Sequence, residues 1–168
     1  QIRGEASRLE RVTEAYLRLA RMPDPHPEAV LLNELVATLV RFLNDDRVRC
    51  DVDPELRAFI DPDGLRSVLL NLLQNPLHAV YPTAGEVVVR GESARGGHVT
   101  LTLTDNGPGI PKHILERRGE PFVKGRPTGT GLGVALAMEI LSAQNSKLRI
   151  SCPKSGGTRC RIDLPKVS

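Results

Sequence analysis

Two glycine-rich segments of this 168-residue chain have the composition of loops that bind phosphate. The first glycine segment, Asp105–Gly109 (DNGPG), directly follows an alternating pattern typical of a strand, and the second, Gly129–Gly133 (GTGLG), directly precedes a helical pattern. A glycine-rich turn that opens a helix exposes backbone N–H groups at the positive end of the helix dipole, which suits a phosphate. The second segment is not a Walker A loop, because no lysine follows its last glycine. Two ordinary turns are the alternative for either segment alone.

The stretch between these segments, Ile110–Thr128, is a candidate lid. It shows no sustained period, contains several prolines and glycines, and carries five basic residues: Lys112, Arg117, Arg118, Lys124 and Arg126. Loops of this length without regular structure are uncommon in compact domains and often close over a ligand. A cationic lid beside a phosphate loop predicts a site for a phosphorylated ligand, whereas a solvated charged loop is the alternative.

A third group of polar residues lies on a predicted helix, Asp61–Val80. Asn71, Asn75 and His78 are spaced i, i+4 and i+7, so they share one line along that helix. Buried amides need hydrogen-bond partners, and an amide oxygen is a suitable ligand for Mg²⁺. This line of residues is therefore a candidate ligand site, and an exposed polar face of the helix is the alternative.

The hydrophobic pattern predicts an α+β fold that can position these segments, with helices on one face of a mixed sheet. Asp61 is the predicted N-cap of one helix, and Pro62 occupies its first helical position. Helices are expected at Ile2–Leu19, about Glu28–Asn44, Asp61–Val80 and about Gly131–Gln144. Strands are expected at Val48–Val52, Leu56–Ile60, Glu86–Gly91, Val99–Asp105, Leu148–Cys152 and Thr158–Leu164, the last four as two hairpins.

The composition argues against several classes of protein. A net charge of +3 and an aromatic content of 3% are low for a protein that neutralises phosphates and stacks bases, so we expect no nucleic-acid partner. The longest uncharged stretch, Ser67–Gly85, contains amides, histidine and prolines that exclude a transmembrane helix. An early charged run excludes a signal peptide. Cys50, Cys152 and Cys160 lack metal-ligand spacing and are expected to pack as reduced thiols, the last two facing each other across the final hairpin.

In combination, the segments resemble the ATP-binding catalytic domain of bacterial sensor histidine kinases, within the gyrase–chaperone–kinase ATPase superfamily. Five strings carry the resemblance: an N box at Asn71–Val80 (NLLQNPLHAV), a first glycine box at Asp105–Ile110 (DNGPGI), an F box at Glu120–Phe122 (EPF), a second glycine box at Gly129–Ala137 (GTGLGVALA) and a closing hairpin at Gly156–Pro165 (GGTRCRIDLP). Each string alone is moderately specific, whereas all five in this order are highly specific. The resemblance implies a Bergerat-type two-layer α/β sandwich in which three helices back a mixed sheet, plus an N-terminal helix from a dimerisation region.

The resemblance also implies that the ligands are ATP and Mg²⁺. Asp105 would accept a hydrogen bond from the adenine amino group, supported by Thr158 through water. Gly107 and Gly109 would let the backbone approach the base. Asn75 would be the Mg²⁺ ligand. The remaining residues implied to contact the nucleotide, mainly at its phosphates, are Asn71, His78, Lys124, Arg126, Thr130, Gly131, Leu132 and Gly133.

The implied function is the ATP-binding half of a two-component sensor histidine kinase, which passes the γ-phosphoryl group of ATP to a histidine. None of the four histidines is followed by an acidic residue, so the phosphoacceptor is expected upstream and no catalytic residue is assigned within this fragment. Residues 1–22 would end the dimerisation and phosphotransfer helix, 23–29 would form a linker, and 30–168 would be the catalytic domain. The expected partners are that upstream domain and a response regulator. We expect the full-length protein to be a homodimer and the fragment to dimerise weakly at most. We expect the domain to lie in the cytoplasm, either as part of a cytoplasmic protein or as the cytoplasmic part of a membrane sensor.

Two residues depart from the family pattern: Pro76, where alanine is usual, and Gly119, where a bulky apolar residue is usual. Proline inside a helix costs about 3 kcal/mol and disfavours helical geometry at the preceding residue, here Asn75. Either the helix kinks and still offers Asn75, or Mg²⁺-ATP binding is weakened and the chain is a poor kinase, a nucleotide-binding pseudokinase or a partner-binding module. An anti-sigma-type serine kinase shares the fold, but Ile2–Leu19 fits a dimerisation hairpin better. A gyrase-like ATPase is disfavoured because Asn71 lies where its general base would be.

Overall fold

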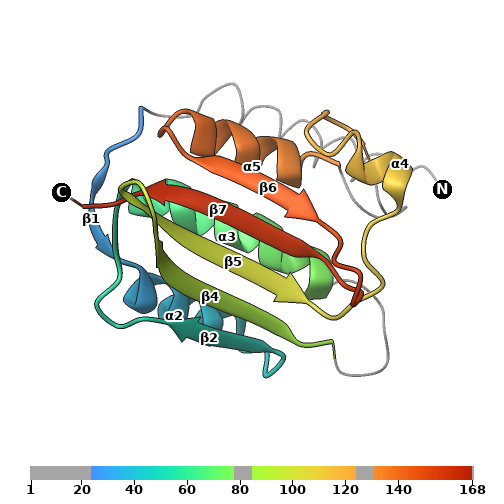
Figure 1. Cartoon of the computed structure of the whole chain (residues 1–168), viewed down its shortest axis with the longest axis horizontal. Coiled ribbons are helices and arrows are strands. Elements are labelled where there is room, and N and C mark those ends of the chain that lie inside the picture. The colour runs from blue at the N-terminus through green and yellow to red at the C-terminus, as the bar shows by residue number, and fades with distance from the viewer. Residues whose placement is uncertain (1–23, 78–84, 124–130, 168) are drawn as a thin grey trace, which may run out of the picture.

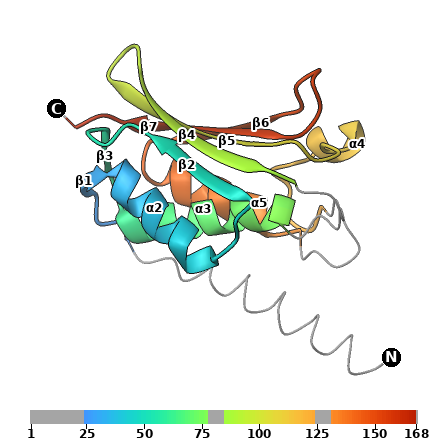
Figure 2. The same ribbon diagram turned by 90° about the horizontal axis from the view of Figure 1, so that it is seen from below.

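Three helices cover one face of a five-stranded sheet in the computed structural model, which describes residues 24–77, 85–123 and 131–167 (Figures 1 and 2). The sheet has the order β2-β4-β5-β7-β6; β2 and β4 are parallel and the other pairs are antiparallel. The predicted α+β fold, with three helices on one face of a mixed sheet, is confirmed. The elements are β1 Glu28–Leu31, α2 Leu32–Leu43, β2 Val48–Val52, β3 Arg57–Ile60, α3 Pro62–Leu77, β4 Val87–Ala94, β5 His98–Asp105, α4 Lys112–Leu115, α5 Gly133–Ser142, β6 Lys147–Ser151 and β7 Arg159–Pro165.

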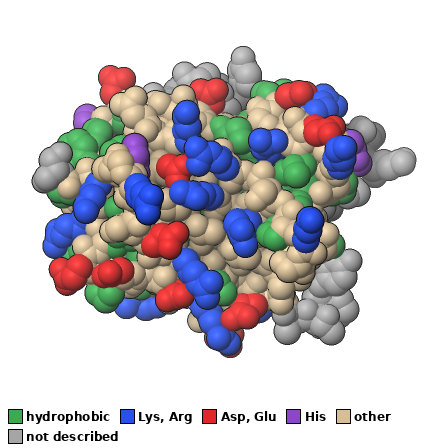
Figure 3. Space-filling model, in the orientation of Figure 1, with side chains coloured by type: hydrophobic (Ala, Val, Ile, Leu, Met, Phe, Trp, Pro, Cys, Tyr) green, Lys and Arg blue, Asp and Glu red, His purple; other side chains and the backbone are tan. Residues whose placement is uncertain are grey.

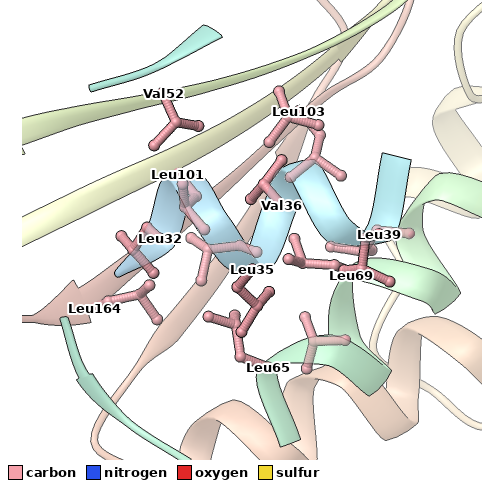
Figure 4. Close-up of a cluster of buried hydrophobic side chains, with 14 of the residues drawn as sticks. Leu32, Leu35, Val36, Leu39, Val52, Leu65, Leu69, Leu101, Leu103 and Leu164 are labelled. Atoms are coloured by element: carbon pink, nitrogen blue, oxygen red, sulfur yellow. The ribbon is translucent and has the colours of Figure 1, made fainter. Parts of the chain in front are cut away.

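The hydrophobic core lies between the sheet and the helices (Figure 4). In α2, the buried residues Leu32, Leu35, Val36 and Leu39 follow the spacing of one helical face. In the strands, alternate residues such as Leu101 and Leu103 point to the same side and are buried. The core also includes Val52, Leu65, Leu69 and Leu164. Because complete burial of such a side chain contributes about 1.5–3 kcal/mol, this layer is the main source of stability.

The opposite face of the sheet is polar, and Lys and Arg side chains gather across it (Figure 3). Exposed arginines pair with carboxylates there: Arg90 Nε on β4 lies 2.9 Å from Asp51 Oδ2 on the neighbouring strand β2, and Arg161 Nε lies 3.0 Å from Asp163 Oδ1 on the same strand, β7. Exposed ion pairs contribute at most about 1 kcal/mol each. The alternation of this polar face with the apolar core face is the pattern that predicted the strands.

The predicted N-cap of α3 is confirmed. The backbone N–H of Asp63 donates to Asp61 Oδ1 at 3.1 Å, and Leu65 N donates to the Asp61 carbonyl at 3.0 Å. Asp61 N in turn donates to Gln144 Oε1 at 2.7 Å, just beyond the end of α5. A Cβ at Gly64 would lie 2.8 Å from Gln144 Nε2, so this glycine allows α3 and α5 to pack closely.

Several predicted boundaries were wrong. The helix expected from Glu28 begins at Leu32, because Glu28–Leu31 forms a small antiparallel sheet with β3 (Glu28 opposite Ile60, Leu31 opposite Arg57). The last predicted helix begins at Gly133 instead of Gly131, because Gly131 has a left-handed φ of +73° that a helix does not accommodate. The short helix α4 inside the candidate lid was not predicted. The expected helix Ile2–Leu19 and the predicted end of α3 at Val80 lie outside the described residues.

Candidate nucleotide-binding site

Asp105, the last residue of β5, has a carboxylate that the backbone of two other segments fixes in place. Its Oδ1 accepts hydrogen bonds from Gly107 N at 2.8 Å and from Thr158 N at 3.2 Å. Within the described part of the chain, both of these bonds reach Oδ1, which leaves Oδ2 for a donor on a ligand. Thr158 was expected to support Asp105 through water; in the structure it does so directly, through its backbone N–H.

The turn before β7 packs directly against the end of β5. Gly157 has a φ of +77°, and a Cβ there would lie 1.8 Å from the Asp105 carbonyl oxygen. Gly109, with a φ of +78°, approaches the same turn, since its Cβ would lie 3.1 Å from the Gly157 carbonyl oxygen. Only glycine accommodates both the left-handed φ and this spacing. The first glycine segment and the closing hairpin therefore form one rigid unit around Asp105, and Gly157 is a site residue that the sequence analysis missed.

A small hollow of ≈ 30 Å³ lies where this unit meets the end of α3. The backbone around it is tied by Glu86 N, which donates to Asn106 Oδ1 at 2.8 Å, and by Asn106 N, which donates to the Glu86 carbonyl at 3.3 Å. Asp105 therefore borders a hollow that also reaches Pro76 of α3. The lining residues are Arg47, Pro76, Gly85, Glu86, Val87, Asp105 and Gly107.

The N-terminus of α5 faces α3 at the second glycine segment. Asn71 Nδ2 donates to the Ser67 carbonyl at 3.0 Å, and a Cβ at Gly133 would lie 3.4 Å from Asn71 Oδ1. Leu132, which is 2% exposed, anchors the start of α5, and its carbonyl accepts from Leu136 N at 2.8 Å. The first-turn N–H groups of a helix have no acceptor within the helix, so this end of α5 fits an anionic group beside Asn71.

The F box is joined to the second glycine segment by backbone contacts. Phe122 N donates to the Gly131 carbonyl at 3.0 Å. A Cβ at Gly131 would lie 2.6 Å from the Phe122 carbonyl carbon. Phe122 itself has a left-handed φ of 67° and is 50% exposed. This contact fixes Phe122, which lies within the candidate lid, close to the start of α5.

The predicted metal ligand Asn75 is exposed on α3, and the helix continues through Pro76 to Leu77. Among the described residues, no group of three or more His, Cys, Asp or Glu side chains could hold a metal ion. A single amide oxygen fits Mg²⁺, which takes few protein ligands and completes its shell with phosphate oxygens and water. Four predicted ligand residues, His78, Lys124, Arg126 and Thr130, lie outside the described residues.

The cysteines near the site are thiols held in packed or hydrogen-bonded positions. Burial raises the pKa of Cys160 to about 12, so this thiol stays protonated at neutral pH and is unreactive. Cys152 does not face it, because Ile150 pairs with Cys160 in the ladder and Cys152 lies beyond the end of β6. Instead, Cys152 Sγ accepts from Ile110 N at 3.3 Å. Cys152 thus links the closing hairpin to the start of the candidate lid.

No helix in the described ranges combines the length and the hydropathy needed to cross a membrane.

An ion pair lies at the edge of the hollow: Arg47 contacts Asp45 Oδ2 through Nη2 at 2.6 Å. The hydrogen bonds from Arg47 lower the pKa of Asp45 to about 2, so the pair is fully ionised at neutral pH.

Comparisons with known proteins agree with the geometry. The family model described as "Histidine kinase-, DNA gyrase B-, and HSP90-like ATPase" matches residues 60–168, which contain α3, both glycine segments and the closing hairpin. Sensory histidine kinase/phosphatase NtrB of Escherichia coli O157:H7 is 37% identical over 145 residues, covering 79% of this chain and 41% of NtrB. The chain thus spans less than half the length of this curated relative.

Solved structures show the same fold. The mycobacterial sensor histidine kinase MprB is 28% identical, with a TM-score of 0.71 over 84% of this chain and 98% of that one. Histidine kinase ThkA, solved in complex with the response regulator protein TrrA, is 25% identical, with a TM-score of 0.75 over 99% of this chain and 49% of that one. The likeness to MprB extends over nearly the whole of that chain.

Proposed function

This chain belongs to the family of histidine kinase-, DNA gyrase B- and HSP90-like ATPases, and from that premise we propose that it performs the ATP-binding and catalytic part of the reaction of a bacterial two-component sensor histidine kinase. One observation carries the proposal. The Asp105 carboxylate, fixed by two backbone N–H groups, borders a hollow at the end of α3, and Asn71 of that same helix faces the N-terminus of α5. This arrangement supports the assignment of Asp105 to base recognition and of the start of α5 to phosphate binding.

Adenine selection follows from the chemistry of Asp105. The adenine ring carries an amino donor where guanine carries a carbonyl oxygen. A carboxylate oxygen accepts from the first and repels the second. Gly107 allows the carboxylate to take this position, because a Cβ there would lie 2.9 Å from Asp105 Oδ1 and would displace the carboxylate.

The phosphates are assigned to the start of α5 and to the lid. Gly131, Gly133 and the backbone N–H of Leu132 would hold the phosphate chain, and Asn75 would hold Mg²⁺ with Asn71 beside it. Bound Mg²⁺ neutralises phosphate charge and orients the γ-phosphoryl group. His78, Thr130, Lys124 and Arg126 complete the assignment, the last two reaching the γ-phosphate.

In the transfer itself, a histidine nitrogen attacks the γ-phosphorus while the bond to the bridging oxygen breaks and ADP leaves. The protein contributes positioning and charge stabilisation, which is most of what phosphoryl transfer requires. The acceptor histidine belongs to a dimerisation and phosphotransfer region, whose last helix we assign to residues 1–22, followed by a linker at 23–29 and the catalytic domain at 30–168.

We assign the same family-derived partners to the whole protein. It would form a homodimer through that upstream region and pass the phosphoryl group to a response regulator, for which the ThkA–TrrA complex is a precedent. We place the domain in the cytoplasm, where ATP is available.

A nucleotide-binding pseudokinase is the second candidate, and Pro76 inside α3 is the observation that favours it. Pro76 directly follows the proposed metal ligand Asn75. A weakened metal site would leave base recognition by Asp105 intact while reducing phosphoryl transfer.

Incubation of the chain with γ-labelled ATP, Mg²⁺ and a separately supplied histidine-bearing phosphotransfer domain tests the proposal. We expect label on the acceptor domain that is lost in acid and stable in base, as phosphohistidine is, and no label on an acceptor lacking its histidine. Acid-stable label would instead indicate a serine kinase. Nucleotide binding without any transfer would favour the pseudokinase.

A further inference from the structure

A cation from a distant part of the chain contacts the last described turn of α3. The last turn of α3 contains no basic residue, and Pro76 within it has no N–H to donate to the Leu72 carbonyl. Arg47, which directly precedes β2, donates from Nη2 to the Leu77 carbonyl at 3.3 Å. This hydrogen bond ties the last described turn of α3 to the segment that precedes β2.

Asp45 holds the Arg47 guanidinium in this orientation. Arg47 Nε donates to Asp45 Oδ1 at 2.8 Å, and Nη2 donates to Oδ2 at 2.6 Å. Asp45 Oδ1 also accepts from the Arg47 backbone N–H at 3.1 Å. Two parallel hydrogen bonds between a guanidinium and a carboxylate fix direction as well as distance. The side chains of Arg47 and Asp45 are only 36% and 23% exposed, which further limits their motion.

The backbone of Arg47 leads to the base-recognition side of the site. Its carbonyl accepts from Val87 N at 2.8 Å, at the start of β4. The neighbouring residue, Glu86, exchanges hydrogen bonds with Asn106, which follows Asp105. Arg47, Pro76 and Asp105 line the same hollow. Arg47 therefore contacts α3 through its side chain and, through its backbone, the segment that is hydrogen-bonded to the first glycine segment.

We propose that Arg47, oriented by Asp45, is a positioning residue for Mg²⁺-nucleotide binding. It fixes the position of the last described turn of α3, and therefore of Asn75, relative to Asp105. It also compensates for the hydrogen bond that α3 loses because Pro76 has no N–H. The part of this inference that concerns the nucleotide rests on the proposed function. The bracing of α3 stands on the geometry alone.

Amide hydrogen exchange of the nucleotide-free protein tests the bracing. In Arg47→Ala, the amides of the last described turn of α3 are expected to exchange about tenfold faster, because that turn loses the hydrogen bond that ties it to Arg47 and opens more often. Arg66→Ala is the matched control, since Arg66 is an ion-paired arginine of the same helix that contacts Asp63 near the other end. Unchanged exchange in Arg47→Ala would overturn the inference.

Calorimetric titration of ATP tests the link to the nucleotide. We expect Arg47→Ala to lower the affinity for ATP with Mg²⁺ by about tenfold and the affinity without Mg²⁺ by less than about threefold. In a Pro76→Ala background, the same substitution should cost no more than about twofold. Arg47→Lys keeps the charge but not the bidentate fork, so an intermediate loss is expected; it also serves if Arg47→Ala folds poorly.

The outcomes separate this inference from the proposed function. Absence of ATP binding by the unsubstituted protein contradicts the proposed function, and hydrogen exchange still decides whether Arg47 braces α3. If the unsubstituted protein binds ATP normally, two results overturn the positioning role while the proposed function stands. One is that Arg47→Ala lowers the affinity for ATP equally with and without Mg²⁺. The other is that Arg47→Ala lowers this affinity equally whether residue 76 is proline or alanine.

Discussion

Replacement of Asp105 by alanine is expected to abolish ATP binding while the domain remains folded. A site built to accept a hydrogen bond from its ligand loses recognition when the acceptor is removed, and we expect a fall in affinity of at least about 100-fold. The substitution also leaves the N–H groups of Gly107 and Thr158 without their carboxylate acceptor. This costs about 1–3 kcal/mol of unfolding free energy, which a domain of this size tolerates. Calorimetry of ATP binding and thermal unfolding measure the two effects.

Asp105→Asn separates recognition from stability. The asparagine keeps an oxygen that can accept from Gly107 and Thr158, but it presents an NH₂ group toward the adenine amino group. We therefore expect near-normal thermal stability combined with a loss of ATP affinity close to that of the alanine variant. Normal ATP binding by either variant would show that Asp105 does not recognise the base.

Gly157→Ala is expected to damage both stability and ATP binding, whereas Gly156→Ala is expected to be mild. Both glycines have left-handed φ angles, +94° at Gly156 and +77° at Gly157. A Cβ at Gly156 meets nothing within 4 Å, so alanine there has only the conformational penalty of about 1–2 kcal/mol. A Cβ at Gly157 would lie 1.8 Å from the Asp105 carbonyl oxygen, so the turn must move away from β5.

That movement would break the two hydrogen bonds between Thr158 and Asp105, which measure 3.0 and 3.2 Å. We expect Gly157→Ala to cost at least about 2 kcal/mol more unfolding free energy than Gly156→Ala, since each broken bond contributes about 1 kcal/mol. Denaturant unfolding of the two variants, followed by ATP titration, checks this. Equal stabilities would contradict the close packing of this turn against Asp105.

Much of the fold could be predicted because its elements have clear periods. The alternation in β4, β5 and β7 and the stripe of α3 are strong signals, and the two hairpins have clear turn residues. The strand β1 could not be predicted, since a short apolar run suits a helix or a strand equally well. Its partner β3 is distant in sequence, so only the tertiary pairing decides.

Within the site, the structure brings together Asp105, Gly107 and Thr158, and it places Asn71 beside Gly133. Their individual roles remain predictions. Gly157, Cys152 and Arg47 were missed because they act through backbone packing or through partners distant in sequence. Gly157 meets Asp105 only because β7 pairs with β5 in one particular register, and no local pattern reports that register.

The effect of Pro76 also depends on its position in the helix. The sequence predicted a conflict between this proline and the helix, yet α3 continues to Leu77. Proline removes one intrahelical hydrogen bond, the one to the Leu72 carbonyl, and the Leu77 carbonyl accepts a hydrogen bond from Arg47. The structure thus keeps Asn75 on the helix, as the first of the two interpretations requires.

Titration of ATP into the purified chain by calorimetry, with and without Mg²⁺, tests the central claim most directly. The account predicts binding in the micromolar to sub-millimolar range that Mg²⁺ strengthens, because Asp105 selects the base and Asn75 holds the metal. Binding that is indifferent to Mg²⁺ would favour the pseudokinase. Absence of binding by a folded protein would contradict the account.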